Sequence, residues 1–394
     1  MKLKQYIVLI LIAIVSCTEP YELQTENFED LLVVEATITN EYKKHVVKLS
    51  HTIPLEETTP SIEHGANVKI ISNTGLEFHF SEVEDQYVSD QEFQIESGLD
   101  YTLQIQTSNG KTYISTPEKT PTAIGIDEVN AIQETKDTVL GVAIKVTSSD
   151  PSNTAKFYRY EYTETYKIIP PYWSPNKVEV NANDELIVSP RTTETRVCFS
   201  SKESNSINVT TTEDQSENTV FNFNVHFLSK EDPKITNRYS ILVKQYIISS
   251  EAYNFYKTLK TLSSNGSLLS QVQPGFIVGN ITNTNNPEEK VVGFFEVSTV
   301  SEKRIFFNFD DIFPNETSSS YFYDCGIQDY TSLVDFPSPN SPLFGGRVDL
   351  FYFIRNNEIV YYDHHPTSGL YLMVYSYCGD CTSFSSNVQP DFWQ

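Results

Sequence analysis

Residues 98–117 read GLDYTLQIQTSNGKTYISTP and have the pattern of a β-hairpin. Tyr101, Leu103 and Ile105 alternate with polar residues, and side chains two positions apart on a strand point to the same face. Residues 108–110, Ser-Asn-Gly, form the turn, because asparagine and glycine tolerate the backbone angles of tight hairpins. The stretch therefore predicts the closing hairpin of a β-sandwich of immunoglobulin or fibronectin type.

Similar strand patterns precede the hairpin from residue 31 onward. They are short, rich in Val, Ile and Thr, and separated by Asn, Gly and Pro: LLVVEATI, HVVKLSHT, ANVKIIS and LEFHFSEV. Pro117 and Pro121 then interrupt the pattern. We therefore expect an N-terminal immunoglobulin-like β-sandwich over residues 29–120 and a domain boundary directly after it.

The remaining residues, 121–394, predict a larger β-rich domain with one packed helix. Its expected strands include FYRYEYTETYKII, RYSILVKQYII, VVGFFEVSTV, KRIFFNF, RVDLFYFI and LYLMVYSY. The helix is expected over residues 250–264, where apolar side chains recur at spacings of three and four and Ser249 or Ser250 can cap the N-terminus. The fold class is therefore mainly β.

The composition excludes some classes of protein. The chain has 394 residues, of which 28 are basic and 52 acidic, for a net charge of −24. Such a charge repels nucleic acid and anionic membrane surfaces, so the sequence predicts no nucleic-acid partner. The 24 Tyr and 24 Phe exclude a disordered acidic chain, because they supply enough apolar surface to fold.

The first residues, MKLKQYIVLILIAIVSCTEP, have the layout of a secretory signal. Their apolar run is shorter than the roughly 20 residues that a membrane-spanning helix needs. Residues 14–17, Ile-Val-Ser-Cys, resemble the bacterial lipobox, whose cysteine receives a lipid and becomes the first residue of the mature protein. We therefore expect residues 1–16 to be a lipoprotein signal peptide, Cys17 to carry the lipid, and residues 17–28 to be a tether.

Four cysteines follow the signal: Cys198, Cys325, Cys378 and Cys381. An even number in an exported chain predicts disulfides, because oxidising compartments let them persist. Four cysteines allow three pairings, and the sequence does not choose among them. A zinc site or a redox centre is disfavoured, because there is one CxxC rather than two and it leads from a strand into a polar tail. We expect a structural staple for the C-terminal strand and tail.

Patterns of catalytic residues are not found in the sequence, which has no GxSxG, no HExxH, no phosphate-binding glycine loop and no dinucleotide fingerprint. Neighbouring residues on a strand point to opposite faces, so a solvated turn is favoured over a metal site at His364 and His365. Asp310 and Asp311 lack the ligand spacing of a calcium loop, and a carboxylate pair across a cleft would need a partner that the sequence does not identify. The sequence predicts no catalytic residue, no cofactor and no metal.

The segment KIIPPYWSPNK contains the best candidates for a binding site. Three prolines stiffen a loop that carries Tyr172 and Trp173, and rigid aromatic residues in loops suit stacking on sugars or insertion into a partner's pocket. The alternative is that Trp173 folds back as a lid on the second core. Trp393 is expected to dock the C-terminal tail.

A family resemblance rests on the ending CGDCTSFSSNVQPDFW, on RVCFSSKESNSINV and on VVGFFEVSTVSEKRIFF. The chain resembles a lipoprotein family of the Bacteroidota, that of domain of unknown function 4249, from LLVVEATITN to Trp393. The most distinctive element is Cys-x-Asp-Cys-Thr followed by Asn and Pro-x-Phe-Trp, matched by Cys378, Asp380, Cys381, Thr382, Asn387, Pro390, Phe392 and Trp393. Residues 383–386 replace a glycine-rich stretch of the family, so no loop function is carried over.

The resemblance implies a function by analogy only, because the family has no established activity. Its members resemble accessory lipoproteins encoded beside TonB-dependent transporters. We expect a non-enzymatic, lipid-anchored binding or accessory protein at the outer membrane, on its periplasmic or cell-surface face, that works with such a transporter in nutrient uptake. The alternatives are a surface hydrolase acting on a polymer and a structural envelope lipoprotein.

The lipobox yields a test of anchoring. The mature protein is expected to begin at Cys17 and to carry lipid, so the intact mass of membrane-extracted protein should exceed that of the polypeptide from residue 17 onward. Cys17→Ala should leave an uncleaved or mislocalised precursor. An unmodified mass, or release of the wild-type protein into the medium, would contradict lipidation.

Overall fold

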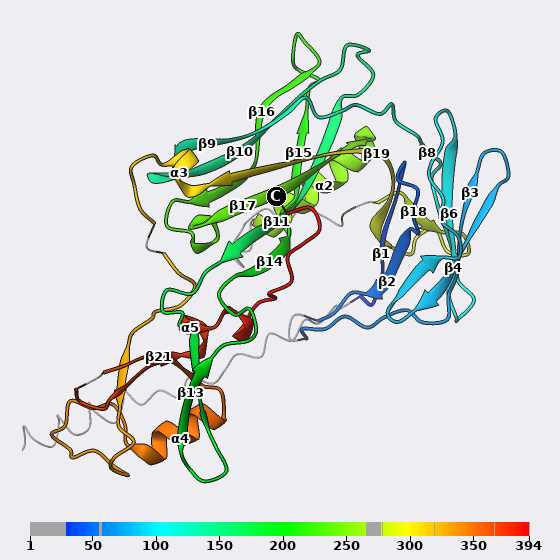
Figure 1. The fold of residues 1–394 in the computed structure, drawn as a ribbon. Coiled ribbons are helices and arrows are strands. Elements are labelled where there is room, and N and C mark those ends of the chain that lie inside the picture. Colours follow the sequence, from blue (N-terminus) through cyan, green and yellow to red (C-terminus); the bar gives the residue numbers. More distant parts are fainter. Residues whose placement is uncertain are drawn as a thin grey trace, which may run out of the picture.

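The computed structural model describes residues 29–54, 57–264, 277, 279–318, 320–365 and 367–393. The predicted signal peptide, Cys17 and the tether lie outside the described residues. The fold is mainly β, as the sequence predicts, and it has three parts (Figure 1): an N-terminal body drawn in blue and cyan, a central body, and a C-terminal module drawn largely in orange and red. Within the described part of the chain, no helix is both long and apolar enough to cross a membrane.

The N-terminal body is a sandwich-like β structure around one core. Its strands follow the order β1-β2-β5-β4-β3-β6-β7, and their inward side chains form a single buried cluster. The strands are β1 (Leu32–Thr39), β2 (Val46–His51), β3 (Asn67–Ser72), β4 (Glu77–Val83), β5 (Gln86–Ser89), β6 (Asp100–Gln106), β7 (Thr112–Ser115) and the short β8 (Glu118–Lys119).

The hairpin at residues 98–117 is confirmed. Strands β6 and β7 pair in antiparallel register, with Ile105 opposite Tyr113. Tyr101, Leu103 and Ile105 are all buried in the core. Gly110 has a φ of 87°, a backbone conformation that glycine adopts without strain.

Strand pairing crosses the boundary predicted after residue 120. Strand β18 (Ile281–Asn283) pairs with β7, and the first half of β19 (Val292–Asn308) pairs in parallel with β1. Gly293 makes this approach possible: its φ is 131°, and a Cβ there would lie 2.0 Å from the carbonyl oxygen of Val34. Residues 281–298 therefore complete the N-terminal body.

The central body is a two-layer β structure that shares β19 with the N-terminal body. The second half of β19 pairs with β17, which pairs with β11. A separate sheet in the order β16-β10-β9 packs on this layer through a second core. The strands of the central body are β9 (Glu128–Lys136), β10 (Val139–Ser149), β11 (Phe157–Ile168), β14 (Cys198–Glu203), β15 (Asn208–Thr211), β16 (Thr219–Ser229) and β17 (Arg238–Ile248), with the helical turns η1 (Pro233–Ile235) and α3 (Phe309–Ile312).

The predicted helix is confirmed as α2 (Ser250–Ser264). Ser249 caps it, because its Oγ accepts a hydrogen bond of 3.2 Å from the backbone N–H of Ala252. Ala252 and Phe255 pack on Phe294 of β19. The helix therefore rests on the sheet where the two bodies meet (Figure 1).

The C-terminal module contains a second helix that the sequence analysis missed. RVDLFYFI, predicted as a strand, is helix α4 (Arg347–Arg355), whose buried residues Leu350, Phe351 and Ile354 lie at helical spacing. An almost continuous apolar run does not distinguish a helix from a buried strand by its period. Around α4 lie β12 (Asn176–Val180), β13 (Leu186–Pro190), β20 (Gln328–Tyr330), β21 (Ile359–His364), β22 (Tyr371–Tyr375), α5 (Ser376–Gly379) and η2 (Cys381–Ser383).

Two disulfides hold this module, one of them to β14 of the central body, and they settle the pairing that the sequence left open. Cys198, at the start of β14, is bonded to Cys381, and Cys325 is bonded to Cys378 in α5. The two cysteines of the CxxC are therefore each tied to a distant residue. The structural staple predicted from the sequence is confirmed.

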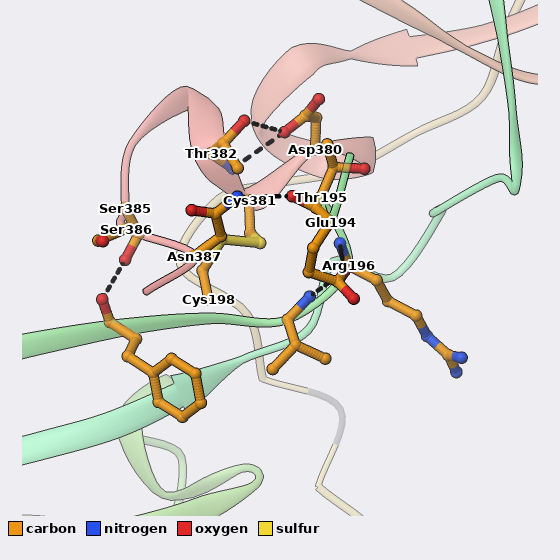
Figure 2. The surroundings of a disulfide bond; sticks show 12 residues. Glu194, Thr195, Arg196, Cys198, Asp380, Cys381, Thr382, Ser385, Ser386 and Asn387 are labelled. Carbon is orange, nitrogen blue, oxygen red and sulfur yellow. Dashed lines mark hydrogen bonds between the residues drawn. A yellow bond between two sulfur atoms is a disulfide. The ribbon is translucent and has the colours of Figure 1, made fainter. Parts of the chain in front are cut away.

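The C-terminal motif surrounds the Cys198–Cys381 bond (Figure 2). Cys381 N–H donates to the carbonyl oxygen of Thr195 at 3.0 Å, and the Asp380 carboxylate accepts from Thr382 N–H at 2.9 Å. The side-chain amide of Asn387 donates to Glu194 O at 2.8 Å. These contacts give the motif a structural role, because they hold the tail against the 194–199 segment.

Trp393 fixes the end of the described chain, as the sequence predicts. Its ring packs edge-on against Phe199 and Phe306, and 9% of the residue is exposed. The chain thus leaves the central body, forms the module and returns to the central body (Figure 1).

Removing the longer-range disulfide should cost stability. Cys198→Ser/Cys381→Ser is expected to lower the free energy of unfolding by about 2–5 kcal/mol, because the bond closes a long loop in the unfolded chain. Urea unfolding without reductant, followed by tryptophan fluorescence, measures the loss. Peptide mapping should show the Cys325–Cys378 bond intact in the variant. An unchanged unfolding midpoint, or a Cys378–Cys381 bond in the wild-type protein, would contradict the assignment.

Candidate functional site

The candidate site is a groove of about 670 Å³ at the junction of the two β bodies. Helix α2 forms one wall with Phe255, Tyr256 and Leu259. The floor is formed by β1, β2 and β19, and its outward side chains, such as Val33 and Glu35, alternate with core residues. A site of this volume accommodates a small organic molecule.

Arg159 of β11 closes the inner end of the groove. Its Nε and Nη2 donate to the two carboxylate oxygens of Glu296 at 3.0 and 2.8 Å, and its Nη1 donates to Glu161. The guanidinium lies 4.1 Å from the ring centroid of Tyr246 and 5.1 Å from that of Tyr256. The two-point contact with Glu296 and the aromatic rings fix the orientation of this buried cation.

The groups around Arg159 stabilise its charge. Burial opposes ionisation of Arg159, but its neighbours, Glu296 above all, raise the pKa of Arg159 well above its usual range. Burial likewise opposes ionisation of Glu161. The positive charge of Arg159 outweighs this effect of burial and lowers the pKa of the Glu161 carboxyl. Tyr246 O–H donates to Glu161 at 2.9 Å. The inner end therefore keeps fixed charges at neutral pH.

The mouth of the groove is lined by basic residues before and within β2. Lys43 is ion-paired with Glu41, which also accepts from Lys244 of β17 at 3.1 Å. Although burial opposes it, these two lysines lower the pKa of Glu41 to about 2. Lys44 and Lys48, in contrast, have no ion-pair partner among the described residues. They lie on the same side of the strand as Val46, which also lines the groove.

His45 also lines the groove and is uncharged at neutral pH. Burial lowers its pKa to about 4, against a hydrogen bond of 3.0 Å between Nε2 and the carbonyl oxygen of Phe93. The positive charge of the groove at neutral pH therefore comes from its lysines and Arg159, and His45 adds none.

Tyr172 and Trp173 lie elsewhere, at the base of the C-terminal module. Trp173 Nε1 donates to Thr195 Oγ1 at 3.0 Å, and the Arg196 guanidinium lies 5.3 Å from the Trp173 ring centroid. Tyr172 packs edge-on against Tyr362. Both aromatics are half-buried, and Trp173 lines a separate hollow of about 410 Å³ that shares no residue with the groove. The structure therefore does not bring the loop and the groove together.

The acidic and histidine pairs weighed as catalytic or metal sites have structural contacts. Asp311 accepts from the backbone N–H of Asn308 at 2.7 Å and so caps the turn α3. The His364 ring packs on Tyr371, whereas His365 contacts Thr367. No group of three or more His, Cys, Asp or Glu side chains suited to a metal occurs among the residues described.

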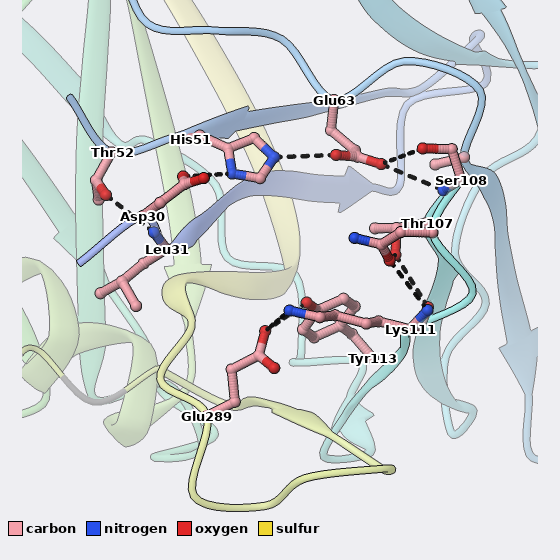
Figure 3. A network of polar contacts seen from close by, with 12 residues as sticks. Asp30, Leu31, His51, Thr52, Glu63, Thr107, Ser108, Lys111, Tyr113 and Glu289 are labelled. Atoms are coloured by element: carbon pink, nitrogen blue, oxygen red, sulfur yellow. Dashed lines mark hydrogen bonds and ion pairs between the residues drawn. The ribbon is translucent and has the colours of Figure 1, made fainter.

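A histidine between two carboxylates, shown in Figure 3, comes nearest to an acid–base arrangement. His51 Nδ1 lies 2.7 Å from Asp30, and Nε2 lies 2.9 Å from Glu63. Ser108 donates to Glu63 rather than to His51, so serine and histidine do not form a nucleophile–base pair. Burial opposes protonation, but Glu63 and Asp30 raise the pKa of His51. Two carboxylates favour the imidazolium, which is not a base, and the network instead ties β2 to the β6–β7 turn.

Comparison with known families decides the classification of the chain. A family model described as "Domain of unknown function (DUF4249)" matches residues 18–304. The chain belongs to this family. The match contains the whole groove but stops before the C-terminal cysteine motif, which lies beyond residue 304. No curated protein was found to match the chain.

The groove residues were missed by the sequence analysis, apart from the helix. Arg159 and Glu296 are 137 residues apart, and no local pattern connects them. A usable signal exists, because Glu296 interrupts the apolar run VVGFFEVSTV and Arg159 sits among aromatics in FYRYEY. A charge within a predicted buried strand implies a partner, since an unpaired buried charge is costly.

Breaking the Arg159–Glu296 pair should be costly. Glu296→Leu is expected to lower the free energy of unfolding by about 3–5 kcal/mol, because the buried guanidinium loses its two-point partner. The double variant Arg159→Met/Glu296→Leu should recover part of this loss, because it leaves no unpaired cation. Denaturant unfolding of the two single variants and the double variant gives the coupling energy. Strictly additive losses would contradict the pairing.

Proposed function

We propose that this protein is a lipid-anchored binding protein of the outer membrane that works with a TonB-dependent transporter in nutrient uptake. The observation that carries the binding role is the groove between α2 and β1, with its fixed inner charges and basic mouth. Preformed concave sites with apolar walls and a few oriented polar groups suit small-molecule binding.

The anchoring part of the proposal rests on the sequence. Residues 14–17 resemble a lipobox, and the polar stretch that follows suits a tether between a lipid and a folded body. Attachment by lipid would keep the protein beside a membrane transporter and raise the local concentration of each for the other.

The transporter part rests on analogy with the accessory lipoproteins that the family resembles. The loop with Tyr172 and Trp173 is the proposed contact surface. Its prolines and the Trp173–Thr195 hydrogen bond reduce the ordering cost of binding, because the aromatics are already held in place. Pro171, next to these rings, is exposed.

Capture of the transporter tests the partnership. Wild-type protein is expected to bring down a TonB-dependent transporter from detergent-solubilised outer membranes. Trp173→Ala should weaken the complex, because truncating an interface aromatic residue typically costs at least about 2 kcal/mol. Phe221→Ala is the matched control, since Phe221 is 74% exposed on β16 in the central body.

The two outcomes are separable. If wild-type protein captures no transporter, the partnership is wrong. If Trp173→Ala captures as much as wild type, the partnership stands and Trp173 is not its anchor.

A further inference from the structure

We propose that the groove selects organic anions with an apolar body, and that Lys44 and Lys48 provide the selection. The inference rests on the proposed binding role of this groove and names the chemical class of its ligand.

The walls of the groove determine the body of the ligand. Phe255 and Leu259 line the groove from α2, and Val33 and Val46 line its floor from β1 and β2. These side chains offer apolar contact without hydrogen-bonding groups, so they favour aliphatic or aromatic matter over sugars.

The lysines determine the charge of the ligand. Glu296 neutralises Arg159, and Glu41 neutralises Lys43. Either cation would have to give up its carboxylate partner to bind an anionic ligand. Lys44 and Lys48 are exposed and have no ion-pair partner in the described part of the chain. Glu35, opposite Lys48 in the β1–β2 register, forms no ion pair with it.

The contrast with the rest of the molecule strengthens the assignment. The chain carries a net charge of −24, yet Lys44 and Lys48 both line the groove and have no ion-pair partner among the described residues. These two lysines attract an anion locally, while the acidic surface of the rest of the molecule repels anions elsewhere. A ligand whose carboxylate lies at the mouth and whose apolar part lies along α2 matches both features.

A matched series of probes tests the charge selection. We would titrate the mature polypeptide, residues 17–394 with Cys17→Ser so that no detergent competes, with 1-pyrenebutanoate, 1-pyrenebutanol and 1-pyrenebutylammonium. The carboxylate is expected to bind about tenfold more tightly than the alcohol, and the ammonium more weakly than either. Pyrene fluorescence reports binding in all three titrations.

Variants assign the preference to residues. Lys44→Gln/Lys48→Gln should remove the carboxylate preference while leaving the affinity for the alcohol nearly unchanged. Lys119→Gln/Lys202→Gln removes the same charge outside the groove and should preserve the preference. Leu259→Ser should weaken binding of the carboxylate probe and of the alcohol probe to the same extent, because both place their pyrene rings along α2.

Each contrary result overturns the inference. Equal binding of acid and alcohol by the wild-type protein, a preference that survives in the Lys44/Lys48 variant, or no binding of any probe would each refute anion selection. None of these results affects the test of the transporter partnership. That test measures capture without a ligand and depends on the separate surface around Trp173.

Discussion

Strand β19 is the element on which the rest of the structure depends. Its first half pairs in parallel with β1, and its second half pairs antiparallel with β17, so one strand belongs to both β bodies. Gly293 permits the close approach at one end, and Glu296 in the first half receives Arg159 from β11. Because the two bodies share this hydrogen-bonded strand, they are joined by strand pairing rather than by a flexible linker. The floor of the groove between them is therefore fixed.

The groove and the C-terminal module are positioned by different kinds of interaction. The groove relies on strand pairing and on one buried ion pair, in which two hydrogen bonds to Glu296 hold Arg159. The module relies on two disulfides and on a tail that returns to the central body through Trp393. The first arrangement fixes the shape of a candidate ligand site, and the second holds an aromatic loop away from it.

Local sequence patterns predicted most of the strands and the longest helix, but they could not predict which distant strands pair. The 98–117 hairpin and helix α2 each follow from periodicity over a few residues, and the docking of Trp393 was expected from its place near the C-terminus. The partner of β1 could not be predicted, because parallel pairing to residues 292–298 leaves no local turn signal. Helix α4 was mistaken for a strand since its apolar run fits both periods. The groove was missed because its floor exists only once β19 is in place.

Shared use of β19 also constrains the order in which the chain can fold. Strands β1 to β7 are synthesised first, yet their body is completed only by residues 281–298. Contacts between such distant segments form slowly, because a long loop must close before they gain energy. A nascent chain that stops before β18 leaves β1 and β7 each with an unpaired edge, and such edges invite aggregation. The first third of the protein is therefore dependent on the last third for its own solubility during biogenesis.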